Sequence, residues 1–175
     1  KTSVYCWGDN RALQLGQALG DDIKAPVLVP FTDGLKPTSV EDVSCGGENC
    51  CIIANGHQDL ICWGDNTIGQ LLVGTNDEPT PPTKVAHQLA DIAAVAVGRA
   101  HLCARQADGQ SRCWGFNRFG QAGAEPSGRV TPRPLGRAYQ HLGAGYLHSC
   151  GISGGEVYCW GRNRAGQLGN GRASR

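Results

Sequence analysis

The sequence contains no methionine, few aromatic residues and no long apolar run. Its most apolar stretch, LADIAAVAVG at 89–98, falls short of the roughly 20 residues that a membrane-spanning helix needs, and it carries Asp91. Because 16 basic residues face 15 acidic ones, the total charge predicts no strong attraction to nucleic acid or to a membrane surface. The sequence therefore predicts neither a membrane span nor a nucleic-acid partner.

Neither an initiating methionine nor a signal peptide is present, so we expect a processed or partial product. Glycine, in contrast, is abundant, with 26 of 175 residues, which is about twice its average usage. Runs of helix-favouring residues are scarce, and turn-forming residues occur throughout the chain. This composition predicts an all-β protein built from many short strands.

One phrase is written four times along the chain. It reads VYCWGDNRALQLG at 4–16, LICWGDNTIGQLLVG at 60–74, SRCWGFNRFGQAG at 111–123 and VYCWGRNRAGQLG at 157–169. Its tryptophans, Trp7, Trp63, Trp114 and Trp160, are 56, 51 and 46 residues apart. Periods of this size are typical of β-propellers and related repeat arrays.

A second phrase precedes the first in three repeats, at 40–53, 92–105 and 139–152. It consists of an alternating apolar segment, a glycine, a polar residue and a cysteine. The aligned positions are Gly46, Gly98 and Gly145, then Asn49, His101 and His148, then Cys51, Cys103 and Cys150. Alternation by two between turn signals predicts small antiparallel sheets.

The two phrases divide the chain into a single repeat array over 1–175. Its units are 1–16, which is partial, 17–74, 75–123 and 124–175, and variable proline-rich connectors lie at 17–39, 75–91 and 124–138. One small sheet cannot bury both of its faces alone, so neighbouring units must stack.

The phrase CWGxNxxGQLG after VxxGxxHxC resembles the repeat of the regulator of chromosome condensation family. The resemblance implies a β-propeller, typically of seven four-stranded blades. About three blades plus partial strands would then belong to a longer ring, or copies of the chain would associate to close one. The sequence departs from the family pattern at Leu13, at the insertion in GQLLVG, at Ala122 and at Asn49.

The cysteines of each complete repeat flank a tight turn. Cys150 and Cys159 are symmetric about Gly154-Gly155, so a two-residue hairpin loop would place them directly opposite each other. The Cα atoms of such a non-hydrogen-bonded pair lie about 4.5 Å apart, which suits a disulfide. Buried free thiols are the alternative, because cysteine is a common core residue.

The other two repeats preserve the same opposition with loops of different length. A three-residue loop at 107–109 closed by Gly109, and a type II′ turn that begins at Gly56, would each align a cysteine pair. The predicted disulfides are Cys51–Cys62, Cys103–Cys113 and Cys150–Cys159. Disulfides indicate an oxidising compartment, so we expect the periplasm, the cell surface or the medium.

Three cysteines remain after these pairs are formed. Cys45 and Cys50 could pair across Gly46-Gly47, which would leave Cys6 as the odd thiol. Cys6 is the tryptophan-side cysteine of its repeat, and its expected partner would lie about ten residues upstream, before Lys1. Both ends of the chain are therefore expected to be cut from a longer array.

The repeated polar residues are expected to be structural. His101 and His148 belong to the second phrase, and Asn49 replaces them in one repeat, so a hydrogen-bonding role is favoured over a metal site. No cysteine spacing is typical of zinc or haem sites, and no metal or cofactor is expected. No nucleophile and base stand in a catalytic pattern, and adjacent residues such as His148 and Ser149 point to opposite faces of a strand. The protein is therefore expected not to be an enzyme.

The tryptophans are expected to pack between blades, and the asparagines and glutamines after them to hydrogen-bond the turn. The connectors, and residues that vary within the otherwise repeated phrase, are the better recognition candidates, because loops on rigid scaffolds usually carry function. The candidate partner-binding residues are Phe31, which is expected to be exposed, Phe116, Arg118, Phe119, Arg162 and Arg164. Arginine and aromatic residues are enriched at binding hot spots, although these side chains could equally be solvated loop residues.

The favoured function is therefore an exported protein-interaction or structural module, which could be a subunit of a larger assembly. The family resemblance includes a propeller that inhibits β-lactamases, so a secreted enzyme inhibitor is the first alternative. Guanine-nucleotide exchange on a nuclear small GTPase is the second, and the predicted disulfides and the balanced charge argue against it.

Overall fold

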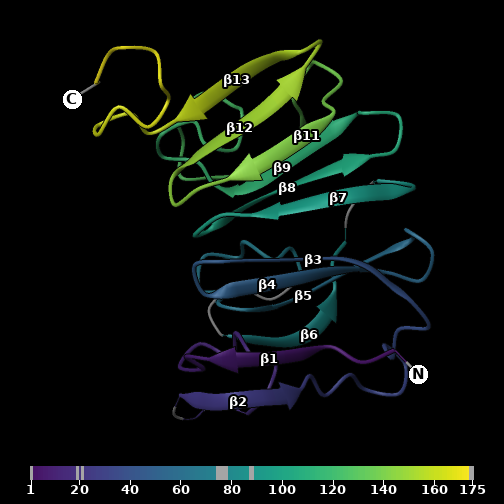
Figure 1. The fold of residues 1–175 in the computed structure, drawn as a ribbon. Helices are drawn as coiled ribbons and strands as arrows, with labels where there is room; N and C mark the ends of the chain where they lie inside the picture. The colour runs from purple at the N-terminus through teal and green to yellow at the C-terminus, as the bar shows by residue number, and fades with distance from the viewer. Residues whose placement is uncertain (1, 19, 21, 74–78, 87–88, 174–175) are drawn as a thin grey trace.

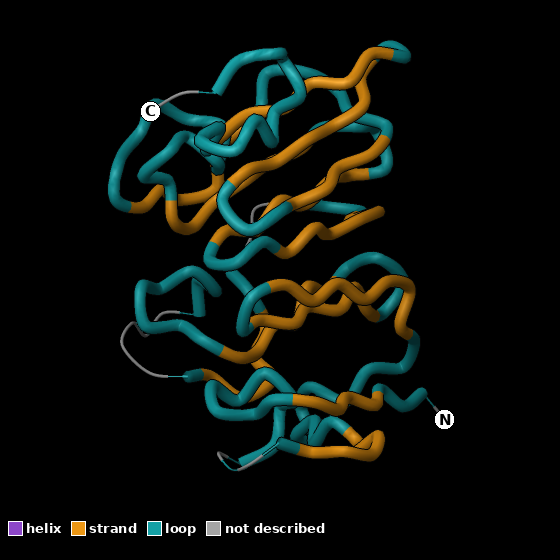
Figure 2. Tube along the Cα trace, turned by 60° about the vertical axis from the view of Figure 1, so that its left-hand side comes forward, coloured by secondary structure: helices purple, strands orange, loops and turns teal. Residues whose placement is uncertain are grey.

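The computed structural model describes residues 2–18, 20, 22–73, 79–86 and 89–173. Strands and loops make up all of these segments (Figures 1 and 2). No described segment forms a helix long and apolar enough to cross a membrane. The prediction of an all-β protein is confirmed.

Within these described ranges, thirteen strands form four antiparallel sheets. The strands are β1 (Tyr5–Gly8), β2 (Ile23–Leu28), β3 (Val40–Gly46), β4 (Asn49–Ala54), β5 (Asp59–Gly64), β6 (Thr80–Lys84), β7 (Ile92–Val97), β8 (His101–Gln106), β9 (Ser111–Phe116), β10 (Arg129–Pro134), β11 (His141–Ala144), β12 (His148–Ser153) and β13 (Glu156–Gly161). Blade 1 contains β1–β2, blade 2 β3–β6, blade 3 β7–β10 and blade 4 β11–β13. The blades stack face to face, from blade 1 at the bottom of Figure 1 to blade 4 at the top.

The connectors carry strands that the sequence did not predict. β2, β6 and β10 all lie in the proline-rich connectors, and each pairs with the strand that contains the tryptophan. Proline lacks the N–H that a central strand must donate, so it is tolerated where one side of the strand is unpaired. The sheets of the sequence units 1–16, 17–74 and 75–123 therefore each end one strand later, in the connector that follows the unit.

The cysteine register is the one predicted. Cys51 pairs with Cys62, Cys103 with Cys113 and Cys150 with Cys159 as directly opposite residues. Each pair is disulfide-bonded, with a Cα–Cα distance of 4.1 Å. The three predicted disulfides are confirmed.

The hairpin turns show how the register is set. Gly154 and Gly155 both have positive φ, 61° and 80°, as a two-residue type I′ turn requires. The loop at 107–109 ends on Gly109 with φ 87°, as expected. The II′ turn at Gly56 is wrong: Ala54 faces Asp59, so the loop has four residues.

This four-residue loop is held by contacts outside its hairpin. Asn55 and His57 both have positive φ, 57° and 68°. The Asn55 Oδ1 atom accepts a hydrogen bond from the backbone N–H of Thr38 at 2.8 Å, and the Ile92 N–H of the next blade donates to the His57 carbonyl at 2.8 Å. These contacts stabilise backbone angles that a non-glycine residue rarely adopts.

The remaining cysteines behave as the sequence suggested. Cys45 and Cys50 form a fourth disulfide, with Cα atoms 4.1 Å apart, and the hairpin between them turns at Gly47-Glu48 instead of Gly46-Gly47. Cys6 is the free cysteine, and it is buried between blades 1 and 2. Burial raises the pKa of the Cys6 thiol, so the thiol stays protonated and unreactive.

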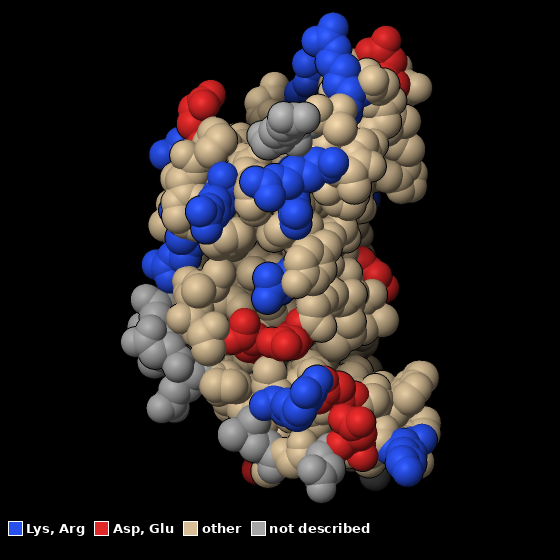
Figure 3. Space-filling view, turned by 90° about the vertical axis from the view of Figure 1, so that its left-hand side faces the viewer, with Lys and Arg blue, Asp and Glu red and all other residues tan. Residues whose placement is uncertain are grey.

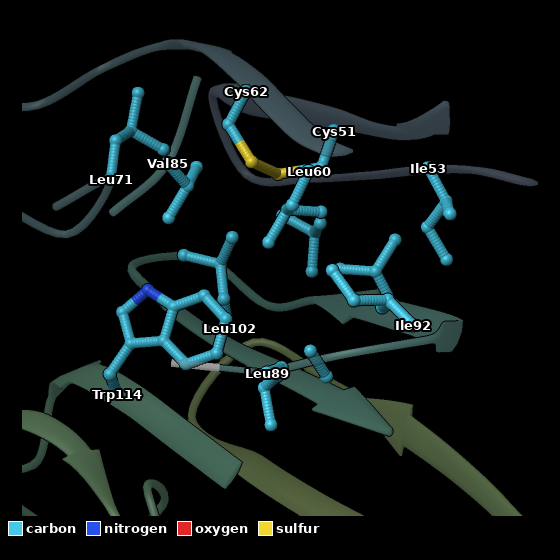
Figure 4. Close-up of a cluster of buried hydrophobic side chains, with 13 residues drawn as sticks. Cys51, Ile53, Leu60, Cys62, Leu71, Val85, Leu89, Ile92, Leu102 and Trp114 are labelled. Atoms are coloured by element: carbon cyan, nitrogen blue, oxygen red, sulfur yellow. A yellow bond between two sulfur atoms is a disulfide. The ribbon is translucent and has the colours of Figure 1, made fainter. Parts of the chain in front are cut away.

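The hydrophobic core lies between the blades. Trp114 of blade 3 packs with Leu60, Leu71 and Val85 of blade 2 (Figure 4). Trp63 of blade 2 lies in the equivalent cluster against blade 1. Trp63 and Trp114 are therefore each buried between their own blade and the preceding one, as predicted.

The disulfides provide a direct test of this fold. Replacing both Cys103 and Cys113 with alanine should lower the free energy of unfolding by about 2–3 kcal/mol, because a loop of roughly ten residues is released in the unfolded chain. Urea unfolding of the wild type and of the double variant measures the difference. Cys6→Ala is the matched control and should unfold without this loss of loop closure, and a change under about 1 kcal/mol in the double variant would contradict the prediction.

Candidate interaction surfaces

The repeated polar side chains close the turn that follows each tryptophan strand. The Oδ1 atoms of the repeated asparagines accept a hydrogen bond from the N–H five residues later. The pairs are Asn10 with Leu15, Asn66 with Leu71, Asn117 with Ala122 and Asn163 with Leu168, at 2.9–3.1 Å. The repeated glutamines accept from the N–H two residues earlier, as Gln121 does from Phe119 at 3.0 Å. Their predicted framework role is confirmed.

The indole nitrogens join each blade to the one before it. The Trp63 Nε1 donates to the Gln14 carbonyl at 2.8 Å, and the Trp160 Nε1 donates to the Gln121 carbonyl at 3.0 Å. Trp114 is the exception, because its buried Nε1 has no partner among the described residues. The blade before Trp114 is blade 2, whose turn contains the inserted residue of GQLLVG.

Blade 1 exposes the face that its neighbours bury. Trp63 and Trp114 are fully buried, whereas Trp7 is 62% exposed and Tyr5, two residues before it, is 55% exposed. Because alternate residues of a strand share a face, the two rings form one apolar surface.

Blade 4 exposes the face that carries its disulfide, which in blades 2 and 3 is covered by the following blade. The Cys51–Cys62 and Cys103–Cys113 disulfides are fully buried under the following blade, whereas Cys150–Cys159 is half-buried. Val157, two residues before Cys159, is 68% exposed. The two ends of the stack therefore present the two complementary halves of an interior blade contact.

A serine and a histidine meet between blades 3 and 4. The Ser149 hydroxyl donates a hydrogen bond to the Gln121 carbonyl at 2.9 Å. The Ser149 Oγ also lies 2.9 Å from the His101 Nε2. Because the hydroxyl proton is already used, Nε2 is the donor in this second hydrogen bond. Both residues are fully buried, and the His101 Nδ1 has no partner among the described residues. A nucleophile needs access and a base held by a third group, so this pair is structural.

The histidine is held neutral by its surroundings. Burial, and secondarily the positive charge that His148 can carry, lower the pKa of His101 to about 4. Sequence reasoning looked only at His148 beside Ser149 and missed this pair, because its two members are 48 residues apart. No group of metal ligands occurs among the residues that the structure describes.

The structure separates the predicted partner-binding residues into two places. The expectation that Phe31 is exposed is wrong, because its ring is half-buried and packs edge-on against Trp63 with the ring centroids 6.1 Å apart. Its connector turns back onto the core between blades 1 and 2. The other candidates, Phe116, Arg118, Phe119, Arg162 and Arg164, all lie where β9 and β13 end.

One end of blades 3 and 4 brings arginine and aromatic side chains together. Arg162 lies 5.6 Å from the ring centre of Phe119, and Arg99 lies 4.8 Å from that of Tyr146. Arg118 and Arg164 are exposed beside them. We call these six residues the arginine–aromatic face. Arg99 and Tyr146 were not predicted, because they lie inside the repeated second phrase.

Charge is unevenly divided along the chain, which the balanced total concealed. Residues 1–91 contain twelve acidic and five basic residues, whereas residues 92–175 contain eleven arginines and three acidic residues. Figure 3 faces the end of the molecule where β13 ends, and Lys and Arg side chains gather over its upper part, where blades 3 and 4 lie. Summing the charge by half of the chain would have found this surface.

The tryptophans give a matched test of blade stacking. Trp63→Ala should lower the free energy of unfolding by about 3–5 kcal/mol, because it leaves a large cavity between two blades. Trp7→Ala should change it by less than about 0.5 kcal/mol, because the ring is largely exposed. Urea unfolding measures both, with Trp63→Phe as a milder variant, and equal losses at the two positions would contradict this account.

His101 predicts a pH dependence of stability. The unfolded histidine binds a proton near pH 6.5 and the folded one near pH 4, so stability is fully present above pH 6.5 and falls as the pH drops toward 4, by about 3 kcal/mol. Urea unfolding from pH 7.5 to 4.5 measures the slope. His101→Asn should flatten the slope, because the side chain that titrates is removed. An unaltered slope in His101→Asn would refute the assignment.

Comparison with known proteins identifies the same repeat in other proteins. A regulator of chromosome condensation (RCC1) repeat model matches residues 2–53 and 154–175, and a second RCC1 repeat model matches 92–121, together more than half of the chain. The Arabidopsis thaliana ultraviolet-B receptor UVR8 is 28% identical over 175 residues, which cover 96% of this chain and 39% of that protein. The human probable E3 ubiquitin-protein ligase HERC4 is 35% identical over 181 residues, covering 99% of this chain and 17% of HERC4.

Solved structures share the fold. Prp20p from Saccharomyces cerevisiae superimposes with a TM-score of 0.81 at 23% identity, over 97% of this chain and 43% of Prp20p. Human WBSCR16 superimposes with a TM-score of 0.85 at 21% identity, over 98% of this chain and 46% of WBSCR16. This chain thus spans less than half the length of each of these four proteins. It belongs to the RCC1 repeat family, and its stacked sheets are blades of an RCC1-type β-propeller.

Proposed function

We propose that this chain is a non-enzymatic protein-interaction module that works outside the cytoplasm. The observation that carries the proposal is the contrast between residues that build the framework and exposed residues that do not. Within blades 2 to 4, the repeated tryptophans, asparagines, glutamines and cysteines are occupied by packing, turn closure and disulfides. Arginine and aromatic side chains that serve none of these roles remain at one end of blades 3 and 4, on a rigid scaffold suited to recognition.

The absence of an assembled catalytic group supports the non-enzymatic part. Among the described residues, the nearest approach to a nucleophile and base is Ser149 with His101, and solvent reaches neither. No cluster of metal ligands offers another route within the described ranges. The surface is therefore better suited to binding than to chemistry.

The cysteines support a location in an oxidising compartment. Eight of the nine lie in four pairs at disulfide distance, and the ninth is buried with a raised pKa. Cytosolic proteins rarely keep so many disulfides, because glutathione and thioredoxin reduce them. We therefore propose export to the periplasm, the cell surface or the medium.

Propellers of the same fold support a protein partner. The structure of Prp20p is described together with its binding to Gsp1p and histones, and another structure shows Kap60 bound to yeast RCC1 (Prp20). Those partners belong to Prp20p, and this chain is only 22–23% identical to it. They support the general use of this scaffold for binding proteins, and we propose a different partner here.

The two ends of the stack support a further contact. The apolar face of blade 1 at Trp7 corresponds to the tryptophan faces that blades 2 and 3 bury. The face of blade 4 at Val157 corresponds to the cysteine faces against which those tryptophans pack. We propose that each end packs against another blade of the same type, from a longer form of the chain or from a second copy, so that a ring is completed.

The native protein provides the test. One sample of the producing cells is alkylated under denaturing conditions, so that the buried Cys6 thiol also reacts, and we expect the protein in an extracytoplasmic fraction with only Cys6 modified. A second sample is cross-linked in the native state, and we expect a cross-link to a second protein through residues 116–119 or 162–164. Mass spectrometry reads both results.

Two outcomes would contradict the two parts separately. If all nine cysteines are alkylated and the protein lies in the cytosol, export is wrong. If the folded, oxidised protein cross-links to nothing but itself, the interaction module is wrong. A cross-linking sample reduced before reaction is the control, and it should lose the partner because the blades are destabilised.

A further inference from the structure

The arginine–aromatic face is continuous across the boundary between blades 3 and 4. Within blade 3, the Phe116 N–H donates to the Ala100 carbonyl at 2.8 Å, and within blade 4 the Arg162 N–H donates to the Leu147 carbonyl at 2.8 Å. These bonds place each loop that follows a tryptophan strand beside the loop that precedes the histidine strand. Arg99 and Arg162 then cross from one blade to the other onto Tyr146 and Phe119.

The two stacked arginines are held in place before any partner arrives. A guanidinium over an aromatic ring gains attraction from the ring and loses part of its freedom, while its edge stays open to hydrogen-bond acceptors. Binding then costs less side-chain entropy than it would with free lysines.

The charge of the face is not neutralised within the described part of the chain. The ion pairs found there are Arg11 with Asp9 and Lys84 with Asp59, both in blades 1 and 2. Arg118 and Arg164 are exposed, and the buried Nε of Arg162 has no hydrogen-bond partner among the described residues. Donors without acceptors favour a ligand that supplies several acceptor oxygens.

The surroundings of the face decide which ligand fits. Glu48 and Asp65 lie in the loops at the same end of blade 2, and Glu125 lies in the loop between β9 and β10. Figure 3 shows a band of acidic side chains below the region where arginine gathers. A long nucleic acid that continued across this end onto blade 2 would meet like charge at Glu48 and Asp65, whereas a short acidic segment would stay on blades 3 and 4. Exposed tyrosine and arginine together are also typical of protein hot spots.

We propose that the arginine–aromatic face binds an acidic segment of a partner protein, with carboxylates paired to Arg99, Arg118, Arg162 and Arg164. The inference rests on the proposed function and adds the chemistry of the partner. Arginine pairs with carboxylates through two parallel hydrogen bonds, so the face selects acidic side chains by geometry as well as by charge. Blades 1 and 2, with their acidic excess, repel the same segment and fix its place on blades 3 and 4.

Charge-reversal variants test the proposal with a labelled poly-glutamate peptide as the probe. Fluorescence anisotropy should show saturable binding to the oxidised chain, weakening as salt is raised. The double variant R118E/R164E should weaken binding about tenfold or more, because two attractions become repulsions. The matched control R133E/R137E makes the same charge change in β10 and the loop after it, at the other end of blade 3, and should weaken binding less than about twofold.

Each other outcome would overturn the proposal. Equal weakening by the two double variants would mean general attraction to the basic half of the chain and no localised face. Tighter binding of single-stranded DNA of equal charge would assign the face to nucleic acid. Equal binding of a poly-glutamine peptide would remove the role of carboxylates.

The failure of this inference can be told apart from failure of the proposed function. If R118E/R164E retains the cross-linked native partner in full, the chain is an interaction module that uses another surface, and only the acidic-segment proposal fails. Unfolding curves of both double variants accompany each measurement, and both should match the wild type, because the four arginines are on the surface.

Discussion

The structure depends on one contact, the indole ring that each blade packs against the blade before it. A sheet of three or four short strands has two apolar faces and cannot bury either one alone. Trp63 and Trp114 are fully buried at such boundaries, and the indole N–H of Trp63 is bonded to a backbone carbonyl across the boundary. Stability is therefore a sum of contacts between neighbours, and the order of the blades in space follows the order of the repeats in the sequence.

A single dipeptide serves two of these boundaries at once. In Cys-Trp, adjacent residues of a strand point to opposite faces, so the tryptophan faces the preceding blade and the cysteine faces the following one. The Cys51–Cys62 disulfide accordingly lies in the same cluster as Trp114 of the next blade. The disulfide locks the hairpin whose two strands form the centre of the blade, and the indole then locks the blade to its neighbour. This coupling explains why the repeat conserves both residues at the same spacing within one chain.

Most repeated side chains build the framework, so the recognition that we propose depends on the residues that vary between repeats. The arginine–aromatic face shows how local variation can accumulate on a regular scaffold. Arg162 lies within the repeated phrase of blade 4 and Phe119 within that of blade 3, yet stacking of the blades brings the guanidinium to 5.6 Å from the ring centre. The same stacking buries His101 against Ser149 and holds its pKa low, so a side chain that titrates in solution becomes a neutral part of the core. The framework residues and the residues proposed for recognition thus differ in exposure more than in residue type.

The sequence by itself determined the features that depend on neighbours within about fifteen residues. The spacing of Cys150 and Cys159 about two glycines gave the register of a hairpin, and the repeated phrases gave the number and order of the sheets. The strands β2, β6 and β10 could not be predicted without knowing where each sheet has its edge. Proline-rich segments form strands only where one side of the strand needs no N–H donor. The burial of Phe31, the pairing of Ser149 with His101 and the meeting of the arginines with their rings were decided only by the tertiary structure. Each of these joins residues from different blades, or from a connector and a blade, and their distances are set by how sheets stack, which no local pattern encodes.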